Sequence, residues 1–495
     1  MIGRRAFLGS AGAGLAAAVV GFDPRERGWV TRAEAAQGPS FARAPELDGE
    51  LALDEASLKA VSTDLGNIVR HTPRAVLRPG SARDISTMIR FCREHRIAVS
   101  PRGAAHTTYG QALSDGLVIE NRSLRRIHAL GRNTAEVDAG IHWMDLAKAA
   151  FAQSPRATPP VLTGYTGLTV GGTLSVGGVG GIVGGLSTGL QVDHVRELEV
   201  VTGTGSVERC SRHRKPDLFE AVLGGLGQCG VITKAVIELV PAKERARTFL
   251  LGYTDNAAFA RDLHTLIERR GVDHVYAEFV APGTAPTYKI HATSFYDPSA
   301  PPHDRKLLDG LSAVPEVSDT GYLEYVFSID TLIDSLRETE NWDRLVKPWF
   351  DVWVPGRAIE RYLADVVPTL TPRDIGTYGA GLIYPQRRAH VHRAQPRLPE
   401  PDGSPWAFIV DINTVSSSPE PEPGFVEEML ARNERLYART RKDYGGELYP
   451  IGSVPLAPRQ WRTHFGDRWP AFRAAKRRYD PAGILTPGHG IFADE

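Results

Sequence analysis

Cysteine is scarce in this chain of 495 residues, which contains only Cys92, Cys210 and Cys229. An odd and sparse set of cysteines does not build a disulfide framework. None of the three belongs to a CxxC pair, the spacing typical of zinc and iron–sulfur sites. We therefore expect no metal site. Stability is expected to come from core packing, for which 42% hydrophobic residues are sufficient.

A surplus of charge of either sign is also absent, because 58 basic side chains balance 58 acidic ones. Proteins that bind nucleic acid or an anionic membrane surface usually carry a basic segment. The sequence shows no such block, so nucleic acid is not expected as a partner. The length is typical of two to four domains.

Long hydrophobic runs are missing, and the apolar stretch 10–22 is too short for a good membrane-spanning helix. A charged start, this short apolar centre and a small-residue end at 33–36 are typical of a signal peptide. Arg4-Arg5 followed by Phe7-Leu8 resembles the signal of the twin-arginine export machinery, which moves folded proteins. We predict that residues 1–36 are this signal and that the mature protein is periplasmic or secreted, without stable membrane association. An uncleaved N-terminal anchor is the alternative.

Two common nucleotide-binding fingerprints are absent as well. No GxGxxG follows the first predicted strand, and no glycine-rich loop ends in the Lys-Ser/Thr of a Walker motif. Three other glycine-rich segments are present: 101–108 (PRGAAHTT), 168–178 (LTVGGTLSVGG) and 223–233 (LGGLGQCGVIT). Successive backbone N–H groups in such turns form concave anion sites suited to a pyrophosphate. Glycines such as Gly103 and Gly171 let the backbone approach it.

The segments around these loops predict alternating strands and helices. A strand at 75–77, a helix that Ser81 caps and a strand at 97–99 make a βαβ unit. The glycine-dense stretch 164–190 interleaves Leu, Val and Ile, which favours an ordered ligand-binding loop over a flexible linker. Further strands are predicted over 117–119, 135–138, 195–202 and 231–240, and further helices over 142–151 and 217–223.

The pattern changes after Pro241, where strand-like runs begin to alternate with amphipathic helices and proline becomes more frequent. We interpret residues 242 to about 440 as a second domain. Its predicted strands cover 275–280, 349–354, 381–384 and 406–412. Residues 461–492 predict a helix followed by a packed tail.

Four stretches together carry a resemblance to a known family. They are PRGAAHTTYGQA (101–112), LTVGGTLS (168–175), DLFEAVLGGLGQCGVIT (217–233) and WRTHFGDRW…YDPAGILTPGHGIF (461–492). They resemble the cytokinin dehydrogenase branch of the vanillyl-alcohol-oxidase-type flavoproteins. The resemblance is specific over most of 70–241 and 445–492 and looser over 242–440.

The resemblance implies an α+β fold. A two-subdomain PCMH-type FAD-binding domain is expected from both ends of the chain, residues 37–241 and the returning segment 441–495. A central α+β substrate-binding cap, residues 242–440, is expected to cover the flavin.

The resemblance also implies an FAD bonded covalently through His106, which matches the histidine attached to the flavin 8α carbon. His489 stands where the family usually has glutamine. Enzymes with two flavin bonds carry a cysteine just before the second glycine loop, and 164–167 contains none, so a single bond is expected. The other implied cofactor contacts are Arg102, Gly103, Ala104, Ala105, Thr107, Gln111, Thr169, Ser175, Val179, Ile232, Thr486 and His489.

One departure from the family concerns the substrate. Cytokinin dehydrogenases carry an aspartate six residues before the VGG loop as proton acceptor for the substrate amine, and Gly164 occupies this position. Cytokinin oxidation is therefore expected to be slow unless another group has taken over. Candidate catalytic residues in the cap are Glu278, Asp351 and Tyr384, with Trp353 as a further pocket candidate. The alternative is that these side chains are structural, since buried aromatics and paired acids are common in cores.

The sequence thus predicts an FAD-dependent oxidoreductase that oxidises a small organic alcohol or amine by hydride transfer to the flavin. Oxygen or another electron acceptor is expected to reoxidise the reduced flavin. Two alternatives stay open: a flavin-binding protein without turnover, and a true cytokinin dehydrogenase with a relocated base.

Overall fold

The computed structural model describes residues 19–23, 28–31, 41, 44–280 and 286–494. The chain divides into two units, Met1–Pro45 and Glu46–Glu495. In the first unit, β1 (Val19–Asp23) and β2 (Gly28–Thr31) form an antiparallel hairpin. The rest of the predicted signal 1–36 lies outside the described residues. Within the described residues, no helix is long and apolar enough to cross a membrane.

The second unit begins with a four-stranded sheet in the order β3-β4-β6-β5. Its strands are β3 (Glu50–Ala52), β4 (Ala75–Arg78), β5 (Val99–Arg102) and β6 (Leu117–Glu120). Helix α3 (Ala82–Glu94) connects β4 to β5, and both strands pair in parallel with β6, which confirms the predicted βαβ unit. Helix α2 (Glu55–Ala60) precedes β4.

The start of α3 differs from the prediction. Ser81 occupies the N-cap position, but its hydroxyl bonds to Asp48 (2.7 Å) and makes no cap hydrogen bond. Asp84, in the first turn, instead accepts backbone N–H bonds from Gly49 and Gly80, both at 2.8 Å. A carboxylate is favoured there because the helix dipole is positive at this end.

The second sheet has the order β11-β10-β12-β8-β7, and its neighbouring strands are antiparallel. Its strands are β7 (Ile127–Leu130), β8 (Thr134–Asp138), β10 (Val195–Thr202), β11 (Val207–Ser211) and β12 (Gly230–Glu238). Helices α4 (Trp143–Phe151), α5 (Val170–Leu174) and α6 (Pro216–Val222) and the short strands β9 (Ala157–Thr158) and β13 (Val240–Pro241) complete this region. The glycine-dense stretch 164–190 is an ordered and largely buried loop around α5, as predicted.

The middle of the chain forms an eight-stranded antiparallel sheet in the order β17-β14-β16-β15-β19-β20-β18-β21. Its strands are β14 (Arg245–Tyr253), β15 (His274–Val280), β16 (Thr287–Tyr296), β17 (Glu316–Gly321), β18 (Phe350–Pro355), β19 (Ala380–Arg387), β20 (Trp406–Asn413) and β21 (Glu447–Leu448). We call this sheet and its helices the cap. The strands predicted over 275–280, 349–354, 381–384 and 406–412 all lie in it.

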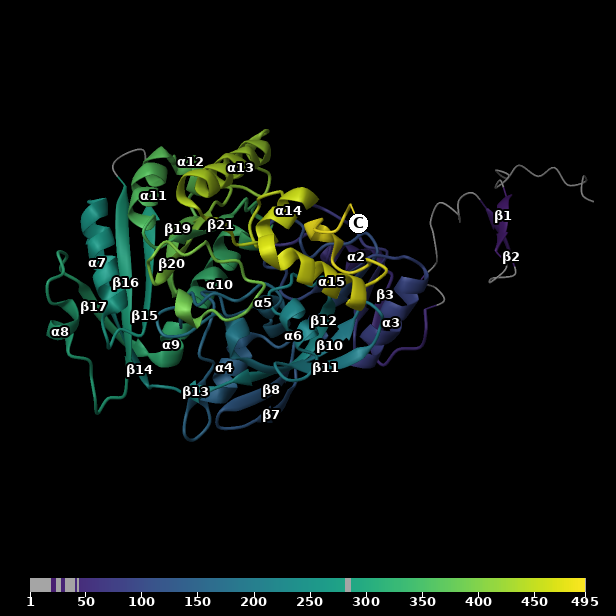
Figure 1. The fold of residues 1–495 in the computed structure, drawn as a ribbon, viewed down its shortest axis with the longest axis horizontal. Coiled ribbons are helices and arrows are strands. Elements are labelled where there is room, and N and C mark those ends of the chain that lie inside the picture. Colours follow the sequence, from purple (N-terminus) through teal and green to yellow (C-terminus); the bar gives the residue numbers. More distant parts are fainter. Residues whose placement is uncertain (1–18, 24–27, 32–40, 42–43, 281–285, 495) are drawn as a thin grey trace, which may run out of the picture. The chain divides into compact units, whose positions relative to one another are not determined.

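Helices accompany the cap sheet, and Figure 1 shows α7 and α11 beside it. The cap helices are α7 (Asn256–Glu268), α8 (Asp304–Leu308), α9 (Tyr322–Val326), α10 (Ser328–Glu340), α11 (Ile359–Val366), α12 (Pro372–Ile375) and α13 (Phe425–Tyr444). The boundary expected at residue 440 lies inside α13. Because β21 follows this helix and pairs with β18, the cap sheet continues to Leu448.

The C-terminal segment returns to the first sheet. After α14 (Pro458–Phe465) and α15 (Trp469–Tyr479), the tail runs parallel to β5: Val99 donates its N–H to Ile484 (2.8 Å), and Thr486 donates to Val99 (2.8 Å). In Figure 1 the yellow C-terminal helices lie next to the purple elements of the first sheet. Both ends of the second unit therefore build one domain, as predicted.

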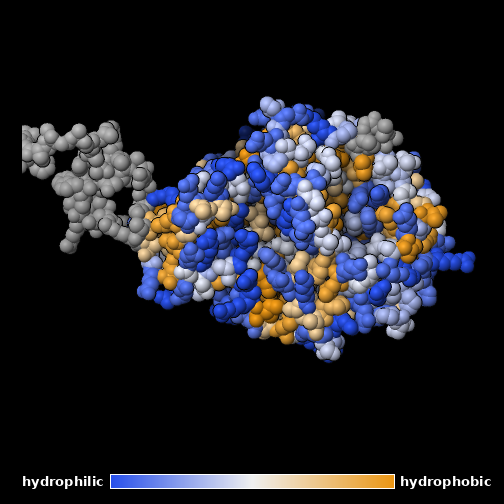
Figure 2. Space-filling model, turned by 180° about the vertical axis from the view of Figure 1, so that it is seen from behind, coloured by the Kyte–Doolittle hydropathy of each residue, from blue (hydrophilic) through white to orange (hydrophobic). Residues whose placement is uncertain are grey.

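The surface is of mixed polarity. Figure 2 shows a face on which hydrophilic residues predominate and hydrophobic residues gather in small groups between them. Such scattered apolar groups are ordinary for a folded protein.

Candidate active site

A cavity of about 400 Å³ lies between the glycine-rich loops and the cap sheet. This volume is in the range of small-molecule sites. The candidate catalytic residues Glu278, Asp351 and Tyr384 line it, whereas Trp353 does not: its indole is buried and packs edge-on against Tyr449. All thirteen predicted cofactor residues also line it: Arg102, Gly103, Ala104, Ala105, His106, Thr107, Gln111, Thr169, Ser175, Val179, Ile232, Thr486 and His489.

His106 lies on the loop that follows β5. Its ring stacks on Tyr165, with centroids 5.3 Å apart, and meets the edge of Trp349 at 5.4 Å. Burial, reinforced by the positive charges of Lys347 and Arg337, lowers the pKa of His106 to about 3. The imidazole is therefore neutral at physiological pH and keeps a free lone pair on one ring nitrogen.

Asp64 organises this loop and was not found from the sequence. Its carboxylate accepts N–H bonds from Gly110 (2.7 Å) and Gly66 (3.1 Å) and the hydroxyl of Thr107 (3.1 Å). Burial raises the pKa of Asp64 to about 6 in spite of these bonds. Its segment, STDLGN, lies ahead of the predicted strands and matches no recognised motif, so only the fold shows its role.

The first and second glycine loops touch each other through glycines. A Cβ at Gly103 would lie 2.1 Å from the Thr169 hydroxyl oxygen, and a Cβ at Gly171 would lie 2.8 Å from the Cβ of Ala139. Neither contact is possible for a larger residue. Thr169 caps α5 by accepting the N–H of Gly172 at 3.3 Å. The two glycines thus leave room for the side chains of Thr169 and Ala139 along one wall of the cavity.

The third loop is fastened to the C-terminal tail. The Thr486 hydroxyl donates to the carbonyl of Gly227 (3.0 Å), and Gln228 donates through Nε2 to the carbonyl of Thr486 (2.9 Å). Buried Lys476 pairs with Asp480 at 2.7 Å and donates to the carbonyl of Gln228 at 3.0 Å. The two ends of the chain are therefore joined at the cavity.

His489, which stands in place of the family's glutamine, also lines this end of the cavity. Burial lowers its pKa to about 4, so its ring is neutral. Its carbonyl accepts the indole N–H of Trp461 at 2.8 Å, and the two rings meet edge to face. The fold thus holds His489 in place as a neutral side chain.

Helix α10 of the cap clamps the loop that contains Gly164. Asp330 accepts the N–H of Thr166 (3.1 Å), its hydroxyl (2.9 Å) and the N–H of Gly167 (2.9 Å). About two turns further along α10, Arg337 donates a hydrogen bond to the hydroxyl of Tyr165 at 3.1 Å. The cap thereby fixes Tyr165, the residue on which the His106 ring stacks.

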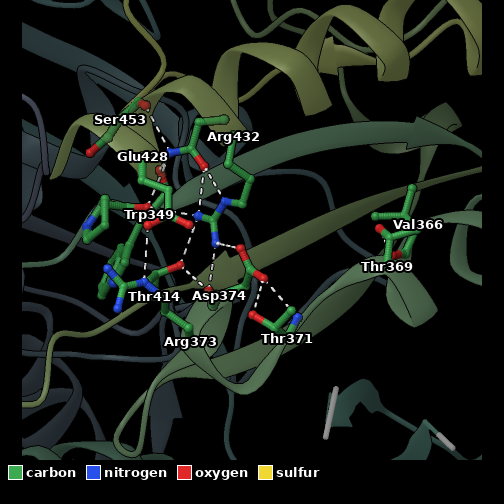
Figure 3. Close-up of polar contacts among 12 residues, drawn as sticks. Trp349, Val366, Thr369, Thr371, Arg373, Asp374, Thr414, Glu428, Arg432 and Ser453 are labelled. Carbon is green, nitrogen blue, oxygen red and sulfur yellow. Dashed lines mark hydrogen bonds and ion pairs between the residues drawn. The ribbon is translucent and has the colours of Figure 1, made fainter. Parts of the chain in front are cut away.

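A buried arginine network in the cap positions Trp349 (Figure 3). Arg432 donates to the carbonyl of Asp374 (2.7 Å) and to the hydroxyl of Thr414 (2.9 Å). The neighbouring Asn433 donates to the carbonyls of Trp349 (3.1 Å) and Ser453 (3.0 Å). Because Trp349 borders His106, the network connects α13 to the cofactor loop.

Two indoles on the cavity wall still have hydrogen-bond capacity. The Nε1 groups of Trp342 and Trp349 are buried and donate to no acceptor within the described part of the protein. Buried donors are almost always paired. These two donors, together with the glycine loops, therefore fit a bound cofactor or substrate rather than a cavity that stays without a ligand.

On the cap side, Glu278 lies 3.4 Å from the Nε2 atom of His291, which lowers its pKa. Tyr384 is enclosed, and burial together with nearby acids raises its pKa well above the usual value. Its hydroxyl lies 3.8 Å from the position that a Cβ at Gly164 would occupy. The absent family aspartate would therefore have faced Tyr384 inside this cavity.

A third acidic side chain on the cap wall, Asp411, was missed by sequence reasoning. It lies directly opposite Asp351 in the β18–β20 register, and both line the cavity. Burial raises the pKa of both carboxyls, and the charge of Asp351 raises that of Asp411 further. An acid within the apolar strand run 406–412 was the available signal.

Comparison with known proteins agrees with this geometry. The model for an "FAD binding domain" matches residues 73–211, and the model for "Cytokinin dehydrogenase 1, FAD and cytokinin binding" matches residues 287–492. An "Uncharacterized oxidoreductase ORF5 in fasciation locus" of Rhodococcoides fascians is 34% identical, over 89% of this chain and 98% of the relative. Cytokinin dehydrogenase 2 of Arabidopsis thaliana is 31% identical, over 90% of this chain and 94% of that enzyme. The chain belongs to the cytokinin dehydrogenase family.

A solved structure supports the fold. The 6-hydroxy-D-nicotine oxidase of Arthrobacter nicotinovorans superposes with a TM-score of 0.69, over 91% of this chain and 100% of the other, at 20% identity. This family member is therefore an FAD-dependent oxidoreductase with the PCMH-type flavoprotein fold. The residues that line the loop side of the cavity fit FAD, because three glycine-rich loops there leave room for close backbone approach.

Proposed function

We propose that the protein oxidises a small organic amine or alcohol by hydride transfer to an FAD bonded covalently to His106. When bound, FAD supplies the hydride acceptor, and the protein positions the donor and takes its proton. The observation that carries the proposal is the make-up of the cavity. Its loop wall holds every predicted flavin contact, and its cap wall holds three acids and Tyr384.

The state of His106 supports covalent attachment. A protonated imidazole has no lone pair with which to bond a carbon atom, and burial with two nearby cations keeps this ring neutral. Tyr165 and Trp349 hold the ring on two sides. Because 164–167 contains no cysteine, we propose one bond to the protein.

The test is anaerobic mixing of the purified flavoprotein with a panel of amines and alcohols. Loss of the oxidised-flavin absorbance identifies donors. The reduced protein is then mixed with oxygen or with an artificial acceptor, and the rates at which the flavin colour returns distinguish an oxidase from a dehydrogenase. If no member of the panel bleaches the flavin, the alternative of a flavin-binding protein without turnover is correct and the proposed function is wrong.

We propose further that the protein is exported by the twin-arginine machinery and acts in the periplasm or outside the cell. The Arg4-Arg5 pair ahead of a short apolar stretch supports this route. Export of folded protein suits an enzyme that must acquire a flavin before it leaves the cytoplasm.

A further inference from the structure

The loop wall of the cavity carries no carboxylate near Gly164. A Cβ at this glycine would have the Tyr384 hydroxyl at 3.8 Å and the Gly181 carbonyl at 3.9 Å as its nearest neighbours. Among the described residues that line the cavity, the acidic ones are Glu278, Asp351 and Asp411, and all three lie on cap strands. A carboxylate that accepts the donor's proton must therefore come from the cap.

Glu278 is the weaker candidate of the three. Its carboxylate lies 3.4 Å from His291 and opposite Lys289 across the β15–β16 pair. These two basic side chains stabilise its charge, which makes it a poor proton acceptor. Glu278 therefore suits a structural ion pair.

Asp351 and Asp411 are placed differently. They are directly opposite each other on neighbouring antiparallel strands, an arrangement that brings Cβ atoms to about 4.5–5.5 Å. Both oxygens of Asp351 and Oδ1 of Asp411 are buried, and no described group other than the partner carboxyl donates a hydrogen bond to them. Asp351 is fully buried, whereas Asp411 keeps 8% of its surface exposed. The pair is therefore reached through Asp411.

Among the described residues, no basic side chain stabilises the charge of this pair. The titratable groups that face it are Tyr384 on β19 and Tyr449 after β21, with Glu278 beyond Tyr384. Gly452 closes the far side, since a Cβ there would lie 2.2 Å from Oδ2 of Asp351. Two adjacent carboxylates cannot both ionise in such surroundings, because like charges at close range repel strongly in a low dielectric. One proton shared by the two carboxyls gives a single buried negative charge.

We propose that Asp351 and Asp411 share one proton and together accept the N–H or O–H proton of the donor, in place of the carboxylate missing at residue 164. This inference rests on the proposed function. The donor's α-carbon loses its hydrogen with two electrons as hydride to FAD, and its heteroatom loses a proton to the pair. An amine becomes an imine and an alcohol becomes a carbonyl compound. The pair then holds two protons and releases one to solvent before the next turnover.

The shared proton is tested without turnover by infrared spectroscopy. At pH 8 the wild-type holoprotein is expected to show the C=O stretch of one protonated carboxylic acid that is absent from the Asp351→Asn/Asp411→Asn double variant. The flavin absorbance and urea midpoint of each variant show whether it is folded and loaded. Identical carboxyl spectra of folded wild type and double variant would overturn the shared proton.

The proton transfer is tested by the rate of anaerobic flavin bleaching by a donor from the panel, measured from pH 5 to pH 9. The double variant is expected to bleach about 10²–10⁴-fold more slowly than wild type, the usual contribution of a positioned base. Each single Asn variant loses the partner carboxyl whose shared proton stabilises the anion, so its rate should fall off at higher pH than that of wild type. Asp273→Asn, the same change at the residue before β15 and outside the cavity, should leave the profile unaltered.

The outcomes separate the two proposals. If wild type bleaches with no donor, the proposed function fails and this inference fails with it. If wild type bleaches and the folded double variant bleaches at the same rate with the same pH profile, the function stands and the pair is not the acceptor. If Glu278→Gln alone removes the pH dependence, Glu278 is the acceptor and the inference is wrong.

Discussion

A histidine forms a bond to a flavin carbon only through an unprotonated ring nitrogen, and the side chains around residue 106 keep it in that form. The ring lies between Tyr165 and Trp349, and the cations of Lys347 and Arg337 oppose its protonation. Both Tyr165 and Trp349 are themselves fastened by cap residues, Arg337 and Asn433. The state of one residue therefore depends on a part of the chain more than 200 residues away in sequence.

His106→Ala is expected to abolish covalent attachment while FAD binding persists, because the glycine loops supply most of the contacts. Acid precipitation should leave yellow colour in the wild-type pellet and move it to the supernatant of the variant. His142→Ala is the control, since His142 lies outside the cavity at the start of α4. Colour retained in the His106→Ala pellet would contradict the assignment.

At the residue scale, local motifs were predictable and lone acids were not. The motif PRGAAHTTYGQA is continuous in sequence, so the position of His106 in the cavity wall could be predicted from the residues next to it. Asp64 acts on Gly66, Thr107 and Gly110, most of them more than 40 residues away in sequence, and nothing near it indicates this. Asp411 stands out as an acid in the apolar run 406–412, but its pairing with Asp351 follows only from the register of β18 and β20.

At the element scale, helix α10 joins the cap to the cofactor loop. Asp330 satisfies two backbone N–H groups and one hydroxyl of the loop at 166–167. Burial raises the pKa of Asp330. The three donor groups make four hydrogen bonds to its two carboxylate oxygens, and these bonds hold the carboxylate in place. Cap and FAD-binding domain are therefore connected by hydrogen bonds as well as by apolar packing.

Asp330→Ala is expected to destabilise the protein, because each buried donor left without a partner costs about 1–3 kcal/mol. The urea midpoint should fall, and FAD should be lost from the noncovalent His106→Ala background more readily. Glu338→Ala is the control on the same helix: its side chain is exposed, and exposed substitutions usually change stability by less than about 0.5 kcal/mol. Equal midpoints for the two variants would show that the clamp contributes nothing.

The periodicity of the sequence predicted most helices and strands, but it did not predict which strands pair with each other. Six strands of the FAD-binding domain, β4, β5, β6, β8, β10 and β12, lie within a few residues of the predicted positions, because alternation and apolar spacing are local properties. Strands β3, β7 and β11 were not predicted. The order of the eight cap strands depends on pairings between distant segments, which periodicity does not encode. For the same reason the end of the cap, expected at 440, fell inside α13, and β21 was not foreseen.

At the scale of the whole molecule, both ends of the second unit must meet before the cavity is complete. Val99 on β5 pairs with the tail at 484–486, and Thr486 binds the third glycine loop. The cofactor site therefore exists only after residues 484–486 have been synthesised and folded. An export route for folded proteins is consistent with this order of events.

Arg4→Lys with Arg5→Lys is expected to hold the precursor in the cytoplasm, because the paired guanidinium groups are the recognised element. Immunoblots of cytoplasmic and extracytoplasmic fractions measure the distribution. Arg25→Lys with Arg27→Lys is the control, since it makes the same change outside the motif. An unaltered extracytoplasmic yield for the first variant would indicate another export route.

The cavity has two walls from two domains, and we expect the choice of donor to depend on which wall takes the proton. The family's acid belongs to the loop wall, whereas this chain has Gly164 there and the Asp351–Asp411 pair on the cap wall. Oxidation of isopentenyladenine, a cytokinin, is therefore expected to be slow compared with an ordinary enzyme rate of about 10 per second. A donor whose N–H or O–H reaches the cap wall should be oxidised faster.

Gly164→Asp places a carboxylate back on the loop wall. The backbone tolerates it, because Gly164 does not have the positive φ that favours glycine and the nearest atoms to an added Cβ are 3.8 Å away. A positioned base typically contributes about 10²–10⁴-fold, so isopentenyladenine turnover with an artificial acceptor should rise by at least tenfold. Gly164→Asn has the same size without the basic group and should not show this gain. If both variants behave alike, or if wild type already turns over isopentenyladenine at about 10 per second, residue 164 does not determine the substrate.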